Sequence, residues 1–298
     1  MSGDVQWSSR MLSMIEYDAI KPILVKLIHN SKRITLQDMI ATIHPLFPNR
    51  TFSLESLLSL QSQLYVRKMK YEHGKGIDEG KFNFILTQTD HAFFDWHHGY
   101  SSYKFAKLYL ERYYRISTVS SFLQHPELVE EDIIRQELLR CISEDPFNSY
   151  QNDVLKQFIG KEYEELLIEM LTDRKMCFET EEELRNKGKP KTPDIVFLIP
   201  MIVNIQHEEH VVNWIDSKAM FADVETYLDS LDQFNGYCNR YGKGLVIYWF
   251  GHVEGIATSS DIRIVDGFPD CWTFPTGEAA SGQVPAFEEA SDGGWMFD

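Results

Sequence analysis

Two aspartates and a lysine in the second half of the chain have the types and spacing that phosphodiester hydrolysis requires. Asp194 follows Pro193, and Asp216 and Lys218 end an apolar run. Such hydrolysis needs a divalent cation that binds phosphate oxygens and lowers the pKa of a water, and a hard cation prefers oxygen ligands. An amine beside the attacking water or the developing charge stabilises the transition state. These residues therefore predict a hydrolytic site for Mg²⁺ or Mn²⁺.

The apolar run that ends at Asp216 predicts a strand. Residues two apart in a strand face the same side, so Asp216 and Lys218 should point together while Ser217 points away. Charged groups that end an otherwise apolar strand are costly unless they have partners, and metal coordination would supply them. The simpler alternative is an ordinary surface ion pair or strand end, which each of these residues fits when taken alone.

Two helices can bring further polar groups to this site. Gly160 and Glu164 are four residues apart, as are Gln233 and Tyr237, so each pair lies on one face of its helix. The hydrophobic pattern predicts a helix at 160–171, β segments at 194–199, 201–205 and 211–215, a helix at 223–240, a strand at 245–250 and one more at 262–265. The order α-β-β-β-α-β predicts an α/β layer arrangement.

These motifs resemble the signature of the PD-(D/E)XK nucleases. Pro193-Asp194 followed by Asp216-x-Lys218 resembles the motif that names this superfamily. The upstream helix motif is represented by Gly160-x-x-x-Glu164, and Gln233-x-x-x-Tyr237 is similar to the motif of the RecB-like members. The resemblance implies an αβββαβ nuclease-like core.

A narrower resemblance is to the codanin-interacting nuclease family, whose members carry a Thr-Pro-Asp motif. It rests on the segments 191–194, 214–219, 232–234 and 244–249, and it is close over about residues 155–252. The family implies a nuclease that works with a partner resembling codanin, a large scaffold protein. A catalytically weak or inactive nuclease fold, kept as an adaptor for a partner protein, is the alternative.

The resemblance also implies a set of metal ligands. Asp194 and Asp216 would bind the ion, and Glu164 would be a further ligand, directly or through water. Glu162 competes for that place, because both glutamates are near the start of the helix. The backbone carbonyl of Ser217 could complete the metal shell.

The remaining roles that the resemblance implies concern the substrate. Lys218 would orient or activate the attacking water, or stabilise the pentavalent phosphate, and Gln233 and Tyr237 would position the substrate phosphate or Lys218. The implied catalytic residues are thus Asp194, Asp216, Lys218, Gln233 and Tyr237. One departure from the family is Asp216, where a glutamate is expected. The side chain is one methylene shorter, so the ion must lie slightly nearer the strand.

The first 120 residues predict an all-helical domain. Residues 17–29 carry an apolar stripe, Thr35 can cap a helix that runs to about Leu46, and Ser53 can cap the next. Two short capped helices joined by a Pro-containing turn suit a helix-turn-helix.

The second of these helices ends with Arg67, Lys68 and Lys70, which are candidates for nucleic-acid binding. Basic residues at a helix C-terminus also complement the helix dipole, so this feature alone does not decide for nucleic acid. A mild basic balance supports the first interpretation: residues 1–120 carry 15 basic and 11 acidic side chains, and the remainder carries 14 and 34.

The rest of the chain divides by composition. We expect a helical connector at 121–154, the nuclease-like domain at 155–274 and a disordered acidic tail at 275–298. His91, Asp95, His97 and His98 could form a zinc cluster, but adjacent histidines rarely ligate one ion, so a connection with surface histidines is the better interpretation. The aromatic helix at 103–115 is expected to bury one face.

Composition also bounds the cellular setting. The chain has 298 residues, a net charge of -16 and four cysteines without a CxxC pair, which is typical of reduced thiols in a nuclear or cytoplasmic protein. No stretch reaches about 18 consecutive apolar residues, so no membrane span is expected. We therefore expect a location in the nucleus and cytoplasm. The resemblance to the nucleases implies a DNA or RNA substrate.

Overall fold

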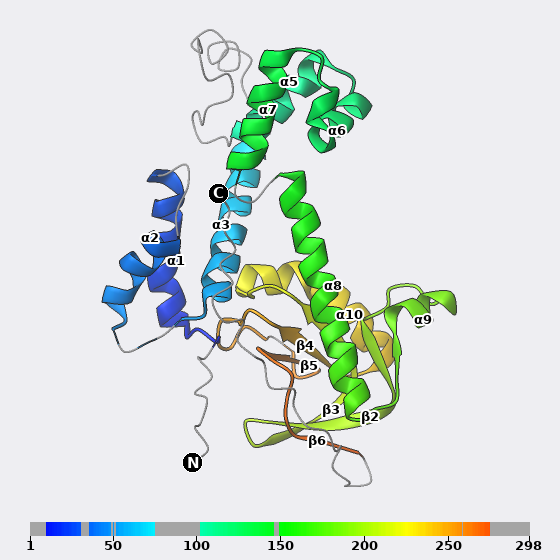
Figure 1. The fold of residues 1–298 in the computed structure, drawn as a ribbon. Helices are drawn as coiled ribbons and strands as arrows, with labels where there is room; N and C mark the ends of the chain where they lie inside the picture. The colour runs from blue at the N-terminus through cyan, green and yellow to red at the C-terminus, as the bar shows by residue number, and fades with distance from the viewer. Residues whose placement is uncertain are drawn as a thin grey trace. The chain divides into compact units, whose positions relative to one another are not determined.

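The computed structural model describes residues 10–30, 36–48, 50, 52–74, 102–145, 149–257 and 259–274 (Figure 1). Two compact units share these residues. The first consists of 1–161, 219–227 and 248–256, and the second of 162–218, 228–247 and 257–298. The chain passes between the two units several times, so each unit contains stretches that are distant in sequence.

The first unit is helical in its N-terminal part, as predicted. Its elements are α1 (Met14–Asn30), α2 (Leu36–Ile43), η1 (His44–Leu46), α3 (Leu54–Gly74), α5 (Ser102–Tyr113), α6 (Ile116–Gln124), η2 (Pro126–Leu128) and α7 (Asp132–Glu144). Ser53 caps α3, because its Oγ accepts a hydrogen bond from the backbone N–H of Ser56 at 3.4 Å.

A separate apolar cluster joins α5, α6 and α7. Tyr103, Phe105 and Leu110 from α5 are buried together with Leu138 and Ile142 from α7. The aromatic helix therefore buries one face, as its pattern predicted, while Tyr113 at its end is exposed.

The two segments from the second half of the chain complete the first unit. Leu12 forms a parallel bridge with Val253, through hydrogen bonds of 2.9 Å from Leu12 N to His252 O and 2.8 Å from Glu254 N to Leu12 O. Gly251 has a φ of 91°, and a Cβ there would lie 1.9 Å from the carbonyl oxygen of Arg10. Only glycine fits this close approach.

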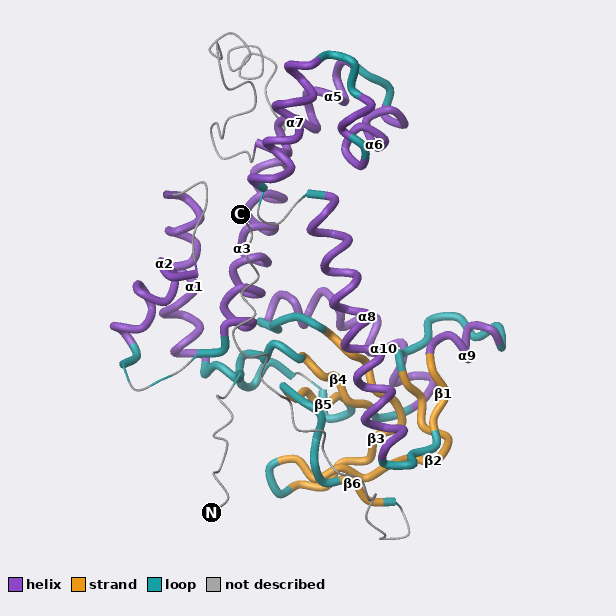
Figure 2. Tube along the Cα trace, in the orientation of Figure 1, coloured by secondary structure: helices purple, strands orange, loops and turns teal. Residues whose placement is uncertain are grey.

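The second unit contains a mixed sheet in the order β1-β2-β3-β4-β5, with β6 paired to β2 (Figure 2). The strands are β1 (Phe178–Thr180), β2 (Ile195–Ile205), β3 (Glu208–Lys218), β4 (Gly244–Tyr248), β5 (Ile262–Val265) and β6 (Trp272–Thr273). β1, β2 and β3 pair antiparallel, whereas β4 and β5 pair parallel. Together with α8 (Tyr150–Asp173) and α10 (Val224–Tyr241), they form the mixed α/β fold expected from the pattern.

The prediction of two strands at 194–199 and 201–205 was wrong, because β2 is one strand through Pro200. Its register with β3 shifts between Val196 and Met201. Proline has no N–H to donate to a ladder, so this irregularity is where it can be tolerated. The interval between the helix predicted at 160–171 and Asp194, for which the pattern predicted no helix or strand, contains β1 and a short helix, α9 (Glu181–Asn186). This helix begins with a capping box between Thr180 and Glu183.

Helix α10 packs on β3 through aromatic side chains. The ring of Trp214 lies 6.3 Å from that of Phe234 and 5.2 Å from that of Tyr237, centroid to centroid. A Cβ on Gly244 would lie 2.0 Å from the Trp214 ring, so β4 can approach this ring only with glycine at that position. This packing fixes the helix that carries Gln233 and Tyr237 against the strand that carries Asp216.

Candidate acid and lysine site

Strands β2 and β3 bring the predicted acids and lysine together. Ile195 pairs with Ile215, so Asp194 just before β2 lies beside the end of β3. The backbone N–H of Ser217 donates a hydrogen bond of 2.6 Å to Asp194 Oδ2. Lys218 Nζ lies 2.6 Å from Asp216 Oδ2, which agrees with the prediction that these two side chains point the same way.

The site lies at the boundary between protein interior and solvent. Asp216 is 1% exposed and Ser217 8%, whereas the side chain of Lys218 is 24% exposed and Asp194 is half-buried. Phe234 contributes one apolar wall, with its ring 5.9 Å from Lys218 Nζ. A charged group in such a place needs partners, because burial removes much of its hydration.

The electrostatics show an excess of negative charge. Burial and then the charge of Asp216 raise the pKa of Asp194 well above its usual range. Burial also raises the pKa of Asp216, although Lys218 opposes that shift. Burial lowers the pKa of Lys218, but Asp216 and Asp194 outweigh it and raise the pKa overall. The single positive charge of Lys218 therefore compensates only in part for two carboxylates that repel each other.

Two glutamates add to this negative charge. Glu164 on α8 is exposed, and its charge acts on both Asp194 and Lys218. Glu181 was not predicted. It is the first residue of α9, and its backbone N–H donates a hydrogen bond of 2.9 Å to the backbone carbonyl of Asp194. Its charge also acts on Asp216. The capping-box residues Thr180 and Glu183 were the sequence signal for this helix start.

Gln233 and Tyr237 brace the segment before Asp194. Gln233 Nε2 donates a hydrogen bond of 2.6 Å to the hydroxyl of Tyr237. This hydroxyl in turn donates a hydrogen bond of 3.0 Å to the carbonyl oxygen of Thr192. Tyr237 is 2% exposed, and burial, followed by the charge of Asp216, raises its pKa. The structure thus shows this pair holding the chain two residues from Asp194.

The described residues contain no group of three or more His, Cys, Asp or Glu side chains already arranged to hold a metal ion. The donor set nevertheless suits a hard divalent cation. Mg²⁺ is commonly bound by one or two carboxylates and keeps several waters, and Asp194 and Asp216 offer two carboxylates against the single ammonium of Lys218.

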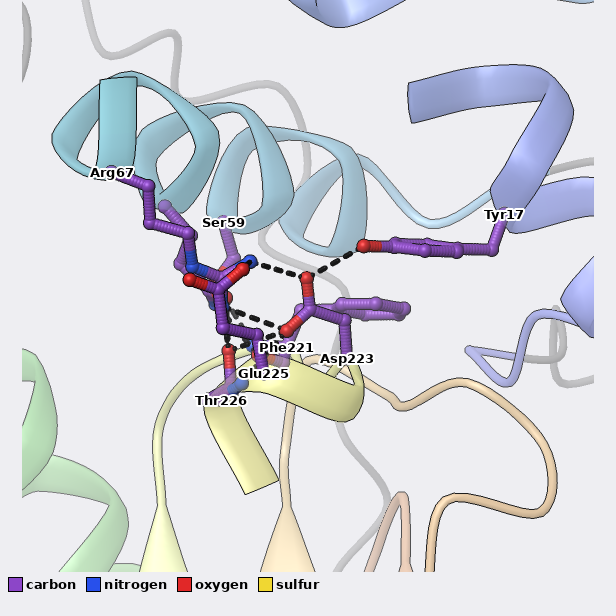
Figure 3. Close-up of polar contacts among 8 residues, drawn as sticks. Tyr17, Ser59, Arg67, Phe221, Asp223, Glu225 and Thr226 are labelled. Carbon is purple, nitrogen blue, oxygen red and sulfur yellow. Dashed lines mark hydrogen bonds and ion pairs between the residues drawn. The ribbon is translucent and has the colours of Figure 1, made fainter. Parts of the chain in front are cut away.

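Of the basic residues expected to bind nucleic acid, which lie within α3, Arg67 forms an ion pair with a buried aspartate (Figure 3). Its guanidinium donates to both carboxylate oxygens of Asp223, at 2.5 and 2.7 Å, and Asp223 is fully buried. Lys68 is half-buried and Lys70 is exposed. Nucleic-acid binding by these residues stays a prediction, and for Arg67 it would compete with a strong internal ion pair.

Several predicted features lie outside the described residues, namely the histidines at 91, 97 and 98, Asp95, the cap Thr35 and the tail at 275–298. Within the part of the chain that the structure describes, none of the helices combines the length and apolar character that a membrane crossing needs.

The fold and these residues define a mixed α/β protein with a buried acid and lysine site beside a Thr-Pro-Asp motif. Residues 130–268 match a family model described as "Protein of unknown function TPD sequence-motif". CDAN1-interacting nuclease 1 of Homo sapiens is 31% identical over 234 residues, which cover 70% of this chain and 79% of the relative. The chain therefore belongs to the TPD-motif family that includes the CDAN1-interacting nuclease 1 proteins.

The relatives from frogs are more similar over a shorter stretch. CDAN1-interacting nuclease 1 of Xenopus laevis is 40% identical over 157 residues, which are 51% of this chain and 50% of the relative. The chain thus spans about half the length of this relative. No solved structure matches the chain at a significant level.

Proposed function

We propose that this protein is a divalent-metal-dependent nuclease with a PD-(D/E)XK core. The observation that carries the proposal is the convergence of Asp194, Asp216 and Lys218 at the adjoining ends of β2 and β3. Two carboxylates and one ammonium are the set that metal-assisted phosphodiester hydrolysis requires. The printed names of the relatives, which call them nucleases, support the same conclusion.

The ion, Mg²⁺ or Mn²⁺, would be held by Asp194 and Asp216, with Glu164 as a further ligand directly or through water and the carbonyl of Ser217 completing the shell. It would bind phosphate oxygens and lower the pKa of the attacking water. Lys218 would then direct its ammonium to that water or to the charge that develops on the phosphate. The hydrogen bond of Tyr237 to the carbonyl of Thr192, supported by that of Gln233 to Tyr237, would keep Asp194 in place during this chemistry.

The proposal extends to the partner and the setting. The relatives' names state an interaction with CDAN1, and we propose that this chain works with a codanin-like scaffold in the nucleus or cytoplasm, on DNA or RNA. One observation favours an alternative, an adaptor with weak or no catalysis. Lys218 Nζ forms an ion pair with one carboxylate oxygen of Asp216 at 2.6 Å, so a metal ion would have to compete with this pair for that oxygen.

Cleavage of labelled oligonucleotides during a Mn²⁺ titration tests the nuclease. Wild-type protein should cut, Asp194→Asn should not, and Lys218→Ala should lower kcat by about 100- to 1000-fold, because it removes a charge aimed at the transition state. Glu208→Gln is the matched control, since Glu208 has a side chain 72% exposed and makes no bond within this site. Equal rates for wild type and all three variants would favour the adaptor.

A further inference from the structure

A short basic segment precedes the catalytic Asp194. Arg185, Lys187, Lys189 and Lys191 stand at every second position of 185–191, without an acid among them, in a chain whose net charge is -16. Helix α9 ends at Asn186, so the helix dipole accounts for Arg185 but not for the lysines that follow. The concentration of positive charge beside the proposed active site needs another explanation.

The segment forms one wall of a cleft of about 550 Å³ in the second unit. Arg185, Lys189 and Lys191 line this wall, and Thr192 and Tyr237 continue the lining. These last two residues are the ones whose hydrogen bond of 3.0 Å braces the chain before Asp194. The cleft therefore shares its lining with the residues that support the proposed catalytic aspartate.

The basic wall is held in a defined conformation. Arg240 Nη1 donates to the carbonyl of Pro190 and, at 3.3 Å, to that of Lys191. Gly188 has a φ of 74° and Lys191 a φ of 53°, so two residues of the segment lie in the left-handed region. For lysine this conformation costs free energy, of order 1 kcal/mol or more, and such strain is concentrated at functional sites.

The four basic side chains differ in what they contact. Lys187 forms an ion pair with Glu179, and Arg185 lies 2.7 Å from Glu181. Lys189 and Lys191 are exposed and face the cleft. The cations that line the cleft all come from this segment, whereas α10 contributes Asp229 and Asp232 and α9 contributes Glu181.

We propose that Lys189 and Lys191, with Arg185 beside them, bind backbone phosphates of a single nucleic-acid strand next to the bond that is cut. An ammonium contacts phosphate as a point charge, and the acids that α10 contributes to the lining disfavour a second strand in the same cleft. The inference rests on the proposed nuclease function and deepens it, because it assigns the substrate class and the place where that substrate enters the site.

Binding of labelled oligonucleotides by full-length protein carrying Asp194→Asn tests this site without cleavage. The pair K189E/K191E is added in one variant and K175E/K243E in its control, since Lys175 and Lys243 are exposed lysines of the same unit outside this cleft. Both double variants change the net charge equally. Fluorescence anisotropy over a series of salt concentrations gives the affinity and its salt dependence.

The expected result is weaker binding of single strands by K189E/K191E, with a slope of log K against log [salt] that is shallower by about 1.4, or 0.7 for each lost phosphate contact. The control should keep the slope of the parent. Equal losses in both variants, no loss in either, or a loss confined to duplex would overturn the proposal. Single-strand binding by wild type without cleavage at any Mn²⁺ concentration would refute the nuclease but leave the site standing. The reverse would follow if K189E/K191E cleaved normally in a chain that keeps Asp194 and bound normally in the chain with Asp194→Asn.

Discussion

The ion pair between Asp216 and Lys218 joins partners of unequal burial. Asp216 is 1% exposed, so Lys218→Ala leaves a carboxylate buried without its cation. We expect a loss of about 3 kcal/mol in the free energy of unfolding, because breaking a buried pair from one side costs about 3–5 kcal/mol and Lys218 is partly exposed. Urea unfolding in the presence of EDTA measures this loss of stability. Lys243→Ala, at an exposed pair with Asp261, should cost less than about 1 kcal/mol.

Asp194 should oppose stability when no metal is bound. Burial and repulsion from Asp216 both disfavour its charged form, so Asp194→Asn should raise the free energy of unfolding in EDTA, by on the order of 1 kcal/mol. The amide can still accept the hydrogen bond from Ser217. Added Mn²⁺ should stabilise wild type but not the variant, and a variant less stable than wild type in EDTA would contradict this view.

At the scale of residues, the sequence predicted that Asp194, Asp216 and Lys218 lie close together. The two-residue spacing in a strand sufficed to place Asp216 and Lys218 on one side, and the ion pair confirms it. Glu181 escaped prediction because it lies on an inserted helix of six residues, too short to show a helical hydrophobic period.

At the scale of elements, Asp223 joins α3 to the start of α10 (Figure 3). It accepts hydrogen bonds from Arg67, from Tyr17 Oη at 2.8 Å and from the backbone N–H of Thr226 at 2.9 Å. Arg67→Ala should therefore cost about 3–5 kcal/mol of stability, since a buried carboxylate loses its cation. Tyr17→Phe should cost about 1 kcal/mol, as one hydrogen bond is lost. Lys107→Ala, at an i,i+4 pair with Glu111 in which both side chains are at least 36% exposed, is the control for chemical denaturation.

The same network predicts a dependence on acid. Burial alone would raise the pKa of Asp223, but bonds from Arg67, Thr226 and Tyr17 outweigh it and hold the pKa well below its usual value. A folded pKa below the unfolded one of about 3.9 contributes stability above that pH, which is lost as the pH falls further. Asp223→Asn should thus flatten the fall in stability below about pH 4. If the free energy of unfolding of Asp223→Asn fell below about pH 4 as steeply as that of wild type, other carboxylates would account for the loss of stability in acid.

The ends of helices and strands were predicted less well where single residues, such as a proline or a basic cluster, suggested an end that the structure does not have. Pro200 suggested a break between two strands, yet the sheet carries β2 through it by shifting register with β3. Helix α3 extends to Gly74, past the basic residues that were expected to end it. Both outcomes come from tertiary pairing, which a single sequence does not display.

At the scale of the molecule, the helices at the N-terminus and two segments of the second half form one unit. Ser59 and Gln63 on α3 bond the backbone of Phe221 at 2.9 and 2.6 Å, and Ser56 donates 2.6 Å to the carbonyl of Phe250. A contiguous division of the sequence, as composition suggests, would separate these partners. The reason is that composition reports local character, whereas these bonds join residues more than 150 positions apart.

A fragment of residues 150–298 should therefore fail to fold by itself. It keeps Asp223 and the backbone around Phe221 but loses their partners on α1 and α3, so a buried charge and several buried polar groups are left unsatisfied. We expect no cooperative thermal transition by circular dichroism and poor dispersion in NMR spectra. Co-expression with residues 1–149 should restore both, because the missing groups return as a separate chain. A fragment that melts cooperatively alone would show that the sheet and its two helices suffice, and that the N-terminal helices are an attachment to a domain already complete.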